Sequence, residues 1–284
     1  MDYELTLFDR IEVIKSVNEK YDLEHNAYLS FSGGKDSTIL HHLLDMALPN
    51  NQIPRVYMDT GIEYQMIRDF VLKLAENDKR IVIIKPSKPI KQTLEQVGYP
   101  FKSKEHSLRV EQFNKGKNSN YIKKYISGYD HNGKKSSFVC PKSLLYQFEE
   151  RGKYNYSNRC CYEMKKKPAH KWAKENHKTM IITGMRAEEG GNRVRLGCLT
   201  NHNTMFHPLI KVDDEWENEF IEREREWHSH PYIANHTTSK GLGAKVVHFL
   251  LTLKNNWKSW NSIFQMKENN ARLFGNQFMM NIGD

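Results

Sequence analysis

The sequence predicts an α/β fold: a doubly wound, Rossmann-like, mainly parallel five-stranded sheet with helices on both faces, a basic insertion and a poorly ordered C-terminal tail. Short apolar segments alternate with amphipathic ones along most of the chain, which is typical of a parallel sheet covered by helices. A Gly-Gly turn separates the first predicted strand from the next helix, as at the start of a βαβ unit. Polar, glycine-containing segments follow three of the strands, where the ligands of such sheets bind.

The elements can be predicted in chain order. Residues 4–24 carry apolar side chains at a spacing of three, which predicts an amphipathic helix. Residues 27–31 read as a buried strand, and residues 37–46 as the helix after the glycines. The other predicted strands are 56–58, 81–84 and 179–183, and the other predicted helices are 64–76, 141–150 and 163–177.

Length and composition indicate a globular protein. The chain has 284 residues, 38% of them hydrophobic and 27% charged, which allows one large α/β domain or one domain with an appendage. No apolar run reaches the roughly 20 residues that span a bilayer, and the first residues do not resemble a signal peptide. We therefore expect a cytoplasmic protein with no membrane partner; the oligomeric state is not predicted.

The positive charge is concentrated in one segment. The formal net charge is +9, and residues 101–140 hold nine lysines and arginines against three acidic residues. A cationic insertion of this kind suits nucleic acid or a polyanionic small molecule. The alternative is a solvated, mobile loop.

The segment Ser32-Gly33-Gly34-Lys35-Asp36-Ser37 has the composition of a phosphate-binding loop. Two glycines let the backbone approach an anion closely, and the N–H groups of the following helix point at it. Lys35 adds a charge, and the hydroxyls of Ser32 and Ser37 add hydrogen-bond donors. The loop lacks the four-residue spacer of a Walker A motif, which disfavours an ordinary P-loop ATPase. The alternative is a tight Gly-Gly turn with capping residues.

This loop, after a buried strand, resembles the PP-loop of the adenine nucleotide α-hydrolase superfamily. Three further motifs resemble the phosphoadenosine phosphosulfate (PAPS) reductase family within it. They are Asp59-Thr60-Gly61-Ile62-Glu63, Thr183-Gly184-Met185-Arg186-Ala187-Glu188 and Phe206-His207-Pro208-Leu209-Ile210. The similarity covers about residues 25–225, so we predict a PP-loop nucleotide-binding domain at 1–226, with the basic insertion at 101–140.

The resemblance implies a site, carried over by position. The nucleotide-binding set would be Ser32, Gly33, Gly34, Lys35, Asp36, Ser37, Asp59, Thr60, Gly61, Glu63, Gly184, Met185, Arg186 and Glu188. Lys35, Asp36 and Arg186 would be catalytic, because a guanidinium suits a sulfate or phosphate. The alternatives are a turn cap for Asp59 and a surface ion pair with Glu188 or Glu189 for Arg186. The helix around Trp216 is expected to be core. ATP, PAPS or adenylylsulfate (APS) is the expected nucleotide, with Mg²⁺ as a candidate accompanying ion.

Adjacent Cys160 and Cys161 form a second feature of the family. In adenylylsulfate reductases a Cys-Cys pair and a later Cys-x-x-Cys hold a [4Fe–4S] cluster. The resemblance therefore implies that Cys160 and Cys161 are two of four ligands. No cysteine follows Cys198, so we do not expect this chain to assemble the cluster. We expect Cys140 and Cys198 to be structural.

The residues from about 227 onward differ in character from the rest. In a codon frame that joins the last base of one codon to the first two of the next, residues 235–250 can encode Pro-Tyr-Asn-Phe-Lys-Arg-Thr-Gly-Cys-Lys-Gly-Cys-Pro-Phe-Ser. Its Cys-x-x-Cys falls about 82 residues after Cys161, where the family has one. We hypothesise that residues 227–284 are a frameshifted product, disordered or loosely helical. The alternative is a genuine, divergent helical tail.

Three functions follow from these observations. The first is a PAPS reductase-like protein that binds ATP or a sulfonucleotide and acts at its phosphate or sulfate end. The second is ATP-dependent adenylation or sulfur transfer on nucleic acid, as in DNA phosphorothioation. The third is a non-catalytic nucleotide-binding remnant, because the Cys-x-x-Cys and the family's catalytic Glu-Cys-Gly-Leu-His segment are both absent.

Overall fold

The computed structural model describes residues 2–117 and 119–223. The hypothesis of a frameshifted tail concerns 227–284, which lie outside the described residues, so it stays a prediction. Two compact units divide the described chain: residues 2–89 with 164–223, and residues 90–163. We call them the sheet unit and the helical unit.

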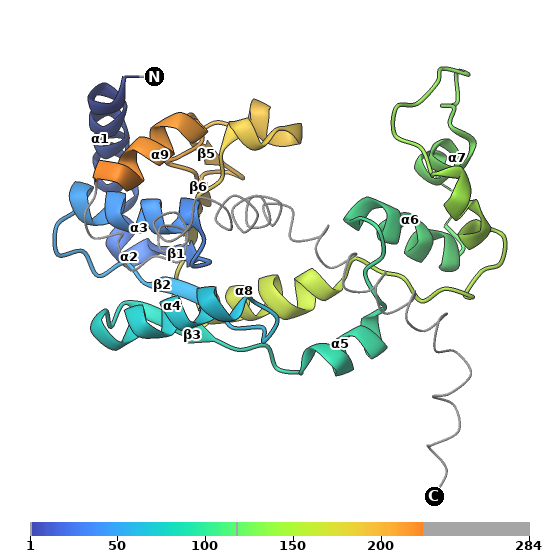
Figure 1. Cartoon of the computed structure of the whole chain (residues 1–284), viewed down its shortest axis with the longest axis horizontal. Coiled ribbons are helices and arrows are strands. Elements are labelled where there is room, and N and C mark those ends of the chain that lie inside the picture. Colours follow the sequence, from blue (N-terminus) through green and yellow to red (C-terminus); the bar gives the residue numbers. More distant parts are fainter. Residues whose placement is uncertain (1, 118, 224–284) are drawn as a thin grey trace, which may run out of the picture. The chain divides into compact units, whose positions relative to one another are not determined.

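The sheet unit contains the predicted alternation of strands and helices (Figure 1). Its elements are α1 (Tyr3–Tyr21), α2 (Leu23–Asn26), β1 (Ala27–Phe31), α3 (Lys35–Ala47), β2 (Arg55–Met58), α4 (Gln65–Asn77), β3 (Ile81–Ile84), α8 (Lys167–Glu175), β4 (Met180–Ile182), η3 (Ala187–Glu189), η4 (Gly191–Arg195), β5 (Leu199–Thr200), β6 (Met205–Phe206) and α9 (Asp214–Arg223). A π-helical turn, η2 (Tyr162–Lys166), precedes α8.

The strands form one sheet in the order β3-β2-β1-β4-β6-β5. All neighbours pair in parallel except β5, which is antiparallel to β6. The predicted doubly wound, mainly parallel fold is therefore confirmed. The sheet has six strands where five were expected. The four strands located in the sequence correspond to β1–β4, whereas β5 and β6 were not located.

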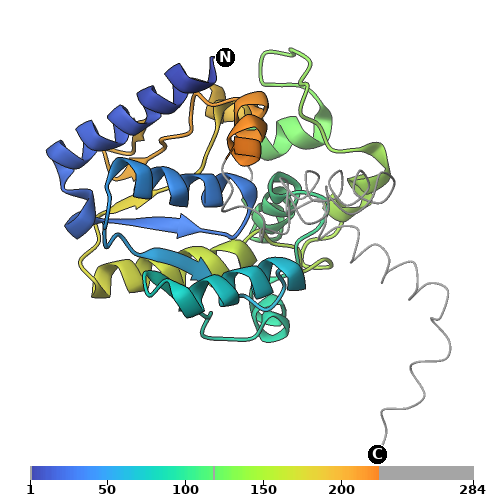
Figure 2. The same cartoon turned by 60° about the vertical axis from the view of Figure 1, so that its left-hand side comes forward.

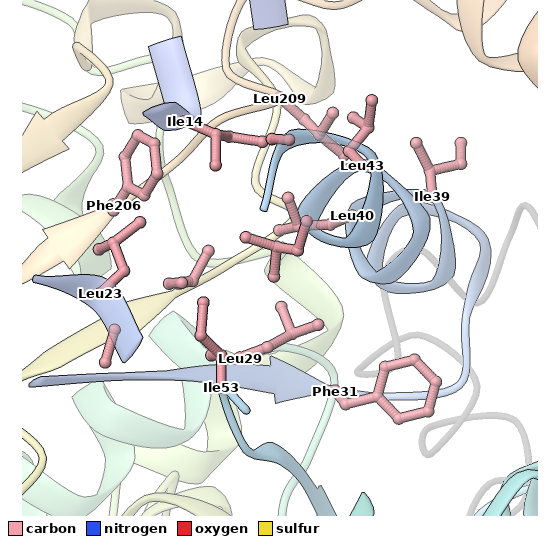
Figure 3. Packing of buried hydrophobic residues seen from close by; sticks show 14 of the residues in the cluster. Ile14, Leu23, Leu29, Phe31, Ile39, Leu40, Leu43, Ile53, Phe206 and Leu209 are labelled. Carbon is pink, nitrogen blue, oxygen red and sulfur yellow. The ribbon is translucent and has the colours of Figure 1, made fainter. Parts of the chain in front are cut away.

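Alternating side chains along the strands build both faces of the sheet. Leu29 and Phe31 of β1 lie in the large core, with apolar side chains of α1, α3, α4 and α9. Tyr28, adjacent to Leu29 in sequence, faces the other way and packs with Trp172 and Ala173 of α8. This period of two places helices on both faces. Figure 3 shows the large core around Leu29 and Leu40.

The helical unit contains the predicted basic insertion, extends beyond it at both ends, and is not a simple loop. It contains α5 (Ile90–Val97), α6 (Lys104–Asn114), α7 (Asn120–Ser127) and η1 (Lys142–Phe148). Its own core gathers Val110, Tyr125, Cys140 and Phe148. Buried His106 hydrogen-bonds through its ring nitrogens to the Tyr125 hydroxyl (2.9 Å) and to Gln147 (2.8 Å).

No helix among the described residues is long and apolar enough to cross a membrane.

Candidate functional site

The candidate site lies at the carboxyl edge of the sheet. The chain enters the sheet at β1, adds β2 and β3 on one side, and returns to add β4 on the other. The strand order therefore reverses between β1 and β4, which is where open α/β sheets bind ligands. The predicted loop follows β1 directly, and Gly184 follows the neighbouring β4. In Figure 2 blue β1 runs into the loop before α3, which returns along the strand.

Local packing explains the glycines of the loop. Gly33 has φ +70°, and a Cβ there would lie 2.6 Å from Val71 Cγ2 and 2.9 Å from Ile67 Cγ2 of α4. Gly184 packs against the backbone of Asp36, where a Cβ would lie 3.0 Å from the Asp36 carbonyl. Gly33 therefore permits the close approach of the loop to α4. Gly184 permits the close approach of the chain after β4 to the first turn of α3.

The two serines brace the loop from within. The hydroxyls of Ser32 and Ser37 are 3.0 Å apart, and Ser37 donates to the Gly34 carbonyl (3.0 Å). The Ser32 N–H donates to Ser37 Oγ (3.2 Å), and the Gly34 N–H to Ser32 Oγ (3.3 Å). Gly34 itself caps α3 without a side-chain hydrogen bond. The helix thus begins at Lys35 with a small, pre-shaped turn, which suits an anion at its N-terminus.

Two cations from distant parts of the chain converge on one carboxylate. Lys35 Nζ lies 2.7 Å from Glu217 Oε2, and Arg186 Nε lies 3.1 Å from Glu217 Oε1. Glu217 and Arg186 have no exposed side-chain surface, and Lys35 retains 9%. Neither oxygen of Glu217 makes a well-aligned hydrogen bond within the described part of the chain, so these contacts are ion pairs at close range.

Further carboxylates surround these cations. Arg186 contacts Asp214 (2.6 Å), Glu188 (3.0 Å) and, more distantly, Asp36 (3.9 Å). Lys35 Nζ also lies 3.4 Å from Asp214. Arg186 therefore does pair with Glu188, but the pair is not the surface contact considered from sequence, because the guanidinium is buried.

Charge and burial shift the titration of this cluster. Burial raises the pKa of Glu217 to about 7, and Asp36 adds to the rise, while Lys35 and Arg186 oppose it. Burial by itself lowers the pKa of Arg186, but Glu217, Asp36 and Asp214 outweigh it, so the pKa of Arg186 is raised. The guanidinium is thus permanently charged, and Glu217 is a group of the cluster that can change charge near neutral pH.

The segment after β2 is organised mainly by its own acidic groups. Asp59 is buried and accepts from Arg68 Nε (3.2 Å). Glu63 accepts from the Thr60 hydroxyl (2.6 Å) and the Thr60 N–H (3.0 Å), and Lys165 Nζ lies 3.4 Å from it. These contacts hold the turn in shape at the end of the strand next to β1.

Three residues of the family motifs, Gly61, Met185 and His207, form no ion pair with the charged groups described above. Gly61, at φ +78°, has no described atom within 4 Å of the position of a Cβ. Met185 is half-buried before Arg186. His207, in the third family motif, is buried and hydrogen-bonds to Thr183 Oγ1 (2.7 Å) and Thr200 Oγ1 (2.9 Å), which ties β4 to the edge of the sheet.

Sequence reasoning missed Asp214 and Glu217. The helix around Trp216 is core as expected: Trp216 is buried and stacks on Tyr3. The same helix nevertheless turns two carboxylates towards the loop. A signal was present, since Glu217 precedes Phe220 and Ile221 by three and four residues, on the face that should be apolar.

The four cysteines lie in different surroundings. Cys160 is buried, and burial raises its pKa to about 11. Cys161 Sγ lies 3.9 Å from Lys104 Nζ. Cys140 belongs to the core of the helical unit, and Cys198 packs against the core of the sheet unit. Within residues 2–117 and 119–223, no group of three or more metal-ligating side chains is gathered.

Comparisons with known proteins bear on this site. The family model of the phosphoadenosine phosphosulfate reductase domain matches residues 26–134. Uncharacterized protein MJ0973 of Methanocaldococcus jannaschii is 31% identical over 151 residues, which are 49% of this chain and 35% of that protein. The chain thus spans about a third of the length of this curated relative.

Two solved structures are similar at 14% identity. They are phosphoadenylyl-sulfate (PAPS) reductase from Candida auris in its phosphate complex (TM-score 0.40, covering 74% of this chain and 78% of that one) and NH3-dependent NAD synthetase from Campylobacter jejuni subsp. jejuni (TM-score 0.44, covering 95% and 96%).

The matched segment contains the loop at Ser32–Ser37 and the motif at Asp59–Glu63. The resemblance seen in these two motifs is thereby confirmed: residues 26–134 match the model of the phosphoadenosine phosphosulfate reductase domain.

Proposed function

We propose that the protein binds an adenine nucleotide, ATP or a sulfonucleotide, at Ser32–Ser37 and acts at its phosphate or sulfate end. The observation that carries the proposal is the convergence of Lys35 and Arg186 at the start of α3. Two cations from segments 151 positions apart in sequence meet beside a glycine turn and a helix N-terminus. That combination favours a tetrahedral oxyanion.

Each group has a defined part in this proposal. The backbone of the loop and the first turn of α3 hold the phosphates, and Lys35 neutralises one of them. Arg186 presents its fork to the terminal phosphate or sulfate. Asp36, close to Arg186 and packed under Gly184, orients the guanidinium. The turn from Asp59 to Glu63 contacts the nucleoside, and Mg²⁺ would accompany ATP.

Calorimetric titration of the full chain with ATP, APS and PAPS tests the proposal. Replacing Lys35 by alanine removes a charged contact, so binding should weaken about 10- to 100-fold. Glu217 keeps Arg186 as a partner in this variant, and thermal unfolding checks that it is folded. Lys79→Ala is the control, because Lys79 is exposed in the turn before β3, at the opposite edge of the sheet. Absence of binding for all three nucleotides would refute the proposal.

The same titration separates a working enzyme from a remnant. A sulfonucleotide reductase attacks sulfur with a cysteine, and burial raises the pKa of both Cys140 and Cys160 above the usual thiol range. Binding without release of pyrophosphate from ATP, and without release of sulfite from APS or PAPS when a dithiol reductant is supplied, would indicate the non-catalytic remnant. The proposal places the protein in the cytoplasm, where its four free cysteines would stay reduced.

A second candidate function is activation of a nucleic-acid acceptor, with the helical unit as the nucleic-acid contact. The acidic groups between residues 101 and 140 are already engaged: Glu105 pairs with Arg109 and Glu111 with Lys115. The Asp130 carboxylate accepts two backbone N–H groups of its own turn. Most lysines between residues 101 and 140 are exposed, so the unit presents an excess of positive charge.

A hairpin in this unit combines charge with an exposed ring. Tyr129 and Lys135 form an antiparallel bridge, and Tyr129 is 54% exposed. Lys134 and Lys135 are exposed beside it. Aromatic rings that stack on bases next to cations that meet phosphates are typical of single-strand binding.

Fluorescence anisotropy with single-stranded DNA and RNA tests this second function. Lys134→Ala combined with Lys135→Ala should weaken binding and reduce its salt dependence. Lys115→Ala, whose charge Glu111 already offsets, should have little effect. Equal effects of the two variants, or binding insensitive to salt, would refute a nucleic-acid contact here.

A further inference from the structure

Glu217 contacts both cations, Lys35 and Arg186, that the proposed function assigns to the phosphate or sulfate group. Both of its oxygens face them, at 2.7 Å from Lys35 Nζ and 3.1 Å from Arg186 Nε. It is fully buried, so water cannot take the place of these cations when they move to a ligand. A nucleotide that recruits Lys35 and Arg186 therefore leaves this carboxylate without compensation.

The cluster around Glu217 holds more negative than positive groups. The cluster contains the two cations Lys35 and Arg186 and four carboxylates, those of Asp36, Glu188, Asp214 and Glu217. With all of them ionised, these six described groups carry two net negative charges before an anionic ligand arrives. Neutralising one carboxylate is the simplest way to admit the ligand.

We propose that Glu217 competes with the phosphate or sulfate group for Lys35 and Arg186, and that nucleotide binding is coupled to the uptake of one proton by Glu217. This inference rests on the proposed nucleotide site, and it assigns to Glu217 the control of the net charge of that site. The proton comes from solvent and adds to a carboxylate oxygen, and the two cations turn to the anionic end of the nucleotide.

Glu217 is distinguished from its acidic neighbours by its surroundings. Asp214 and Glu188 keep 49% and 44% of their side-chain surface exposed, so water can solvate them as anions. Asp36 keeps 22%. The Glu217 side chain has no exposed surface, and neither of its oxygens accepts a well-aligned hydrogen bond from the described residues. Once the two cations turn to a ligand, nothing described would stabilise its negative charge.

The groups that face Glu217 come from two segments packed near α9. Lys35 and Asp36 come from α3, and Arg186 from the segment between β4 and η3. Helix α1 meets α9 through Tyr3 against Trp216, and through Glu4 against Arg223 at the far end.

The electrostatic balance at Glu217 changes when a ligand binds. Burial and Asp36 raise the pKa of Glu217 to about 7 against the opposing effect of the cations. Loss of those cations to a ligand raises it further, so the bound state holds the proton more tightly.

Nucleotide binding should weaken as the pH rises above about 7. Below about pH 7 Glu217 is already protonated in the free protein, and binding needs no further proton. Above that pH each binding event must take one up, so the dissociation constant should rise by about tenfold per pH unit. The effect should persist until the pKa of the bound state is reached.

APS is the appropriate probe, because its phosphosulfate end carries no group that titrates near neutral pH. Calorimetry at about pH 8 in buffers of different ionisation enthalpy counts the protons taken up. The full chain should take up about one proton per APS bound. Glu217→Gln should take up none, and its affinity should be nearly independent of pH and higher than that of the unmodified chain at alkaline pH.

Glu215→Gln is the matched control, since Glu215 lies on the same helix and is exposed. It should keep both the proton uptake and the pH profile. The Glu217→Gln variant should remain folded, because Asp36, Asp214 and Glu188 still offset the two cations.

The outcomes separate the two proposals. APS binding without proton uptake, or uptake unchanged in Glu217→Gln, overturns this inference and leaves the nucleotide site standing. Absence of APS binding at both acidic and alkaline pH, together with absence of ATP and PAPS binding, overturns both. Carboxyl carbon NMR of the ligand-free protein gives an independent readout: a Glu217 midpoint near that of an exposed glutamate would also contradict the inference.

Discussion

Replacement of Gly33 by alanine tests how tightly the loop is fitted to the sheet unit. The new Cβ would lie 2.6 Å from Val71 Cγ2 and 2.9 Å from Ile67 Cγ2. Both neighbours are β-branched and stiff at χ1, and Val71 is fully buried. Relieving this overlap should cost about 1–3 kcal/mol. The left-handed conformation at φ +70° should cost alanine about 1–2 kcal/mol more.

Gly61→Ala is the matched control for this substitution. Gly61 lies in the same unit at φ +78°, but no described atom lies within 4 Å of its Cβ position, so it should show only the conformational cost. Urea unfolding, followed by tryptophan fluorescence, should therefore give Gly33→Ala a free energy of unfolding lower than that of Gly61→Ala by about 1–3 kcal/mol. Equal losses in the two variants would refute the close packing of Gly33 on α4.

Three further predictions concern other parts of the chain. Burial and Arg55 hold the pKa of His41 at about 3, so below about pH 6.5 the unfolded state binds more protons than the folded state. The free energy of unfolding should therefore decrease as the pH is lowered below about 6.5. In urea titrations this decrease should be steeper than in His41→Gln by about 1.4 kcal/mol per pH unit. Asp45→Asn should cost about 1.5–3 kcal/mol in urea unfolding, because it removes the charged hydrogen-bond acceptor of the buried Arg55 guanidinium, 2.7 Å away. Sequencing of the gene should find T as the third base of the Gly243 and Val246 codons; another base at either would contradict the frameshift hypothesis.

Much of the sheet unit could be predicted from local pattern. The strands at 27–31 and 81–84 have the predicted limits, since each is an apolar run bounded by polar residues. The helix after the glycines begins two residues earlier than expected, at Lys35, because the helix N-terminus is part of the loop. Strands β5 and β6 escaped prediction because each has two residues, too few for a periodic signal.

Helices α5, α6 and α7 of the helical unit escaped prediction for another reason, whereas η1 lies within the helix predicted at 141–150. Polar and charged residues dominate the composition of α6, and α7 is only eight residues long, too short for a clear periodic signal. They become helices by packing around Tyr125 and Phe148, which are distant in sequence. Such stabilisation comes from tertiary contact rather than local propensity.

The charge cluster includes a residue, Glu217, that lies outside the recognised motifs. Lys35 and Arg186 could be proposed from the family resemblance, since each lies in a motif that carries it. The role of Glu217 could not, because it depends on which face of α9 meets α3, and that is decided by the packing of Trp216 on Tyr3. Only the assembled structure brings the carboxylate to within 2.7 Å of Lys35.

The most direct test of the central claim is a crystal structure of the full chain with APS. The proposed nucleotide site predicts phosphate or sulfate oxygens within hydrogen-bond distance of the backbone N–H groups at the start of α3, with Lys35 and Arg186 turned from Glu217 to the ligand. A nucleotide bound elsewhere, with both cations still paired to Glu217, would contradict it.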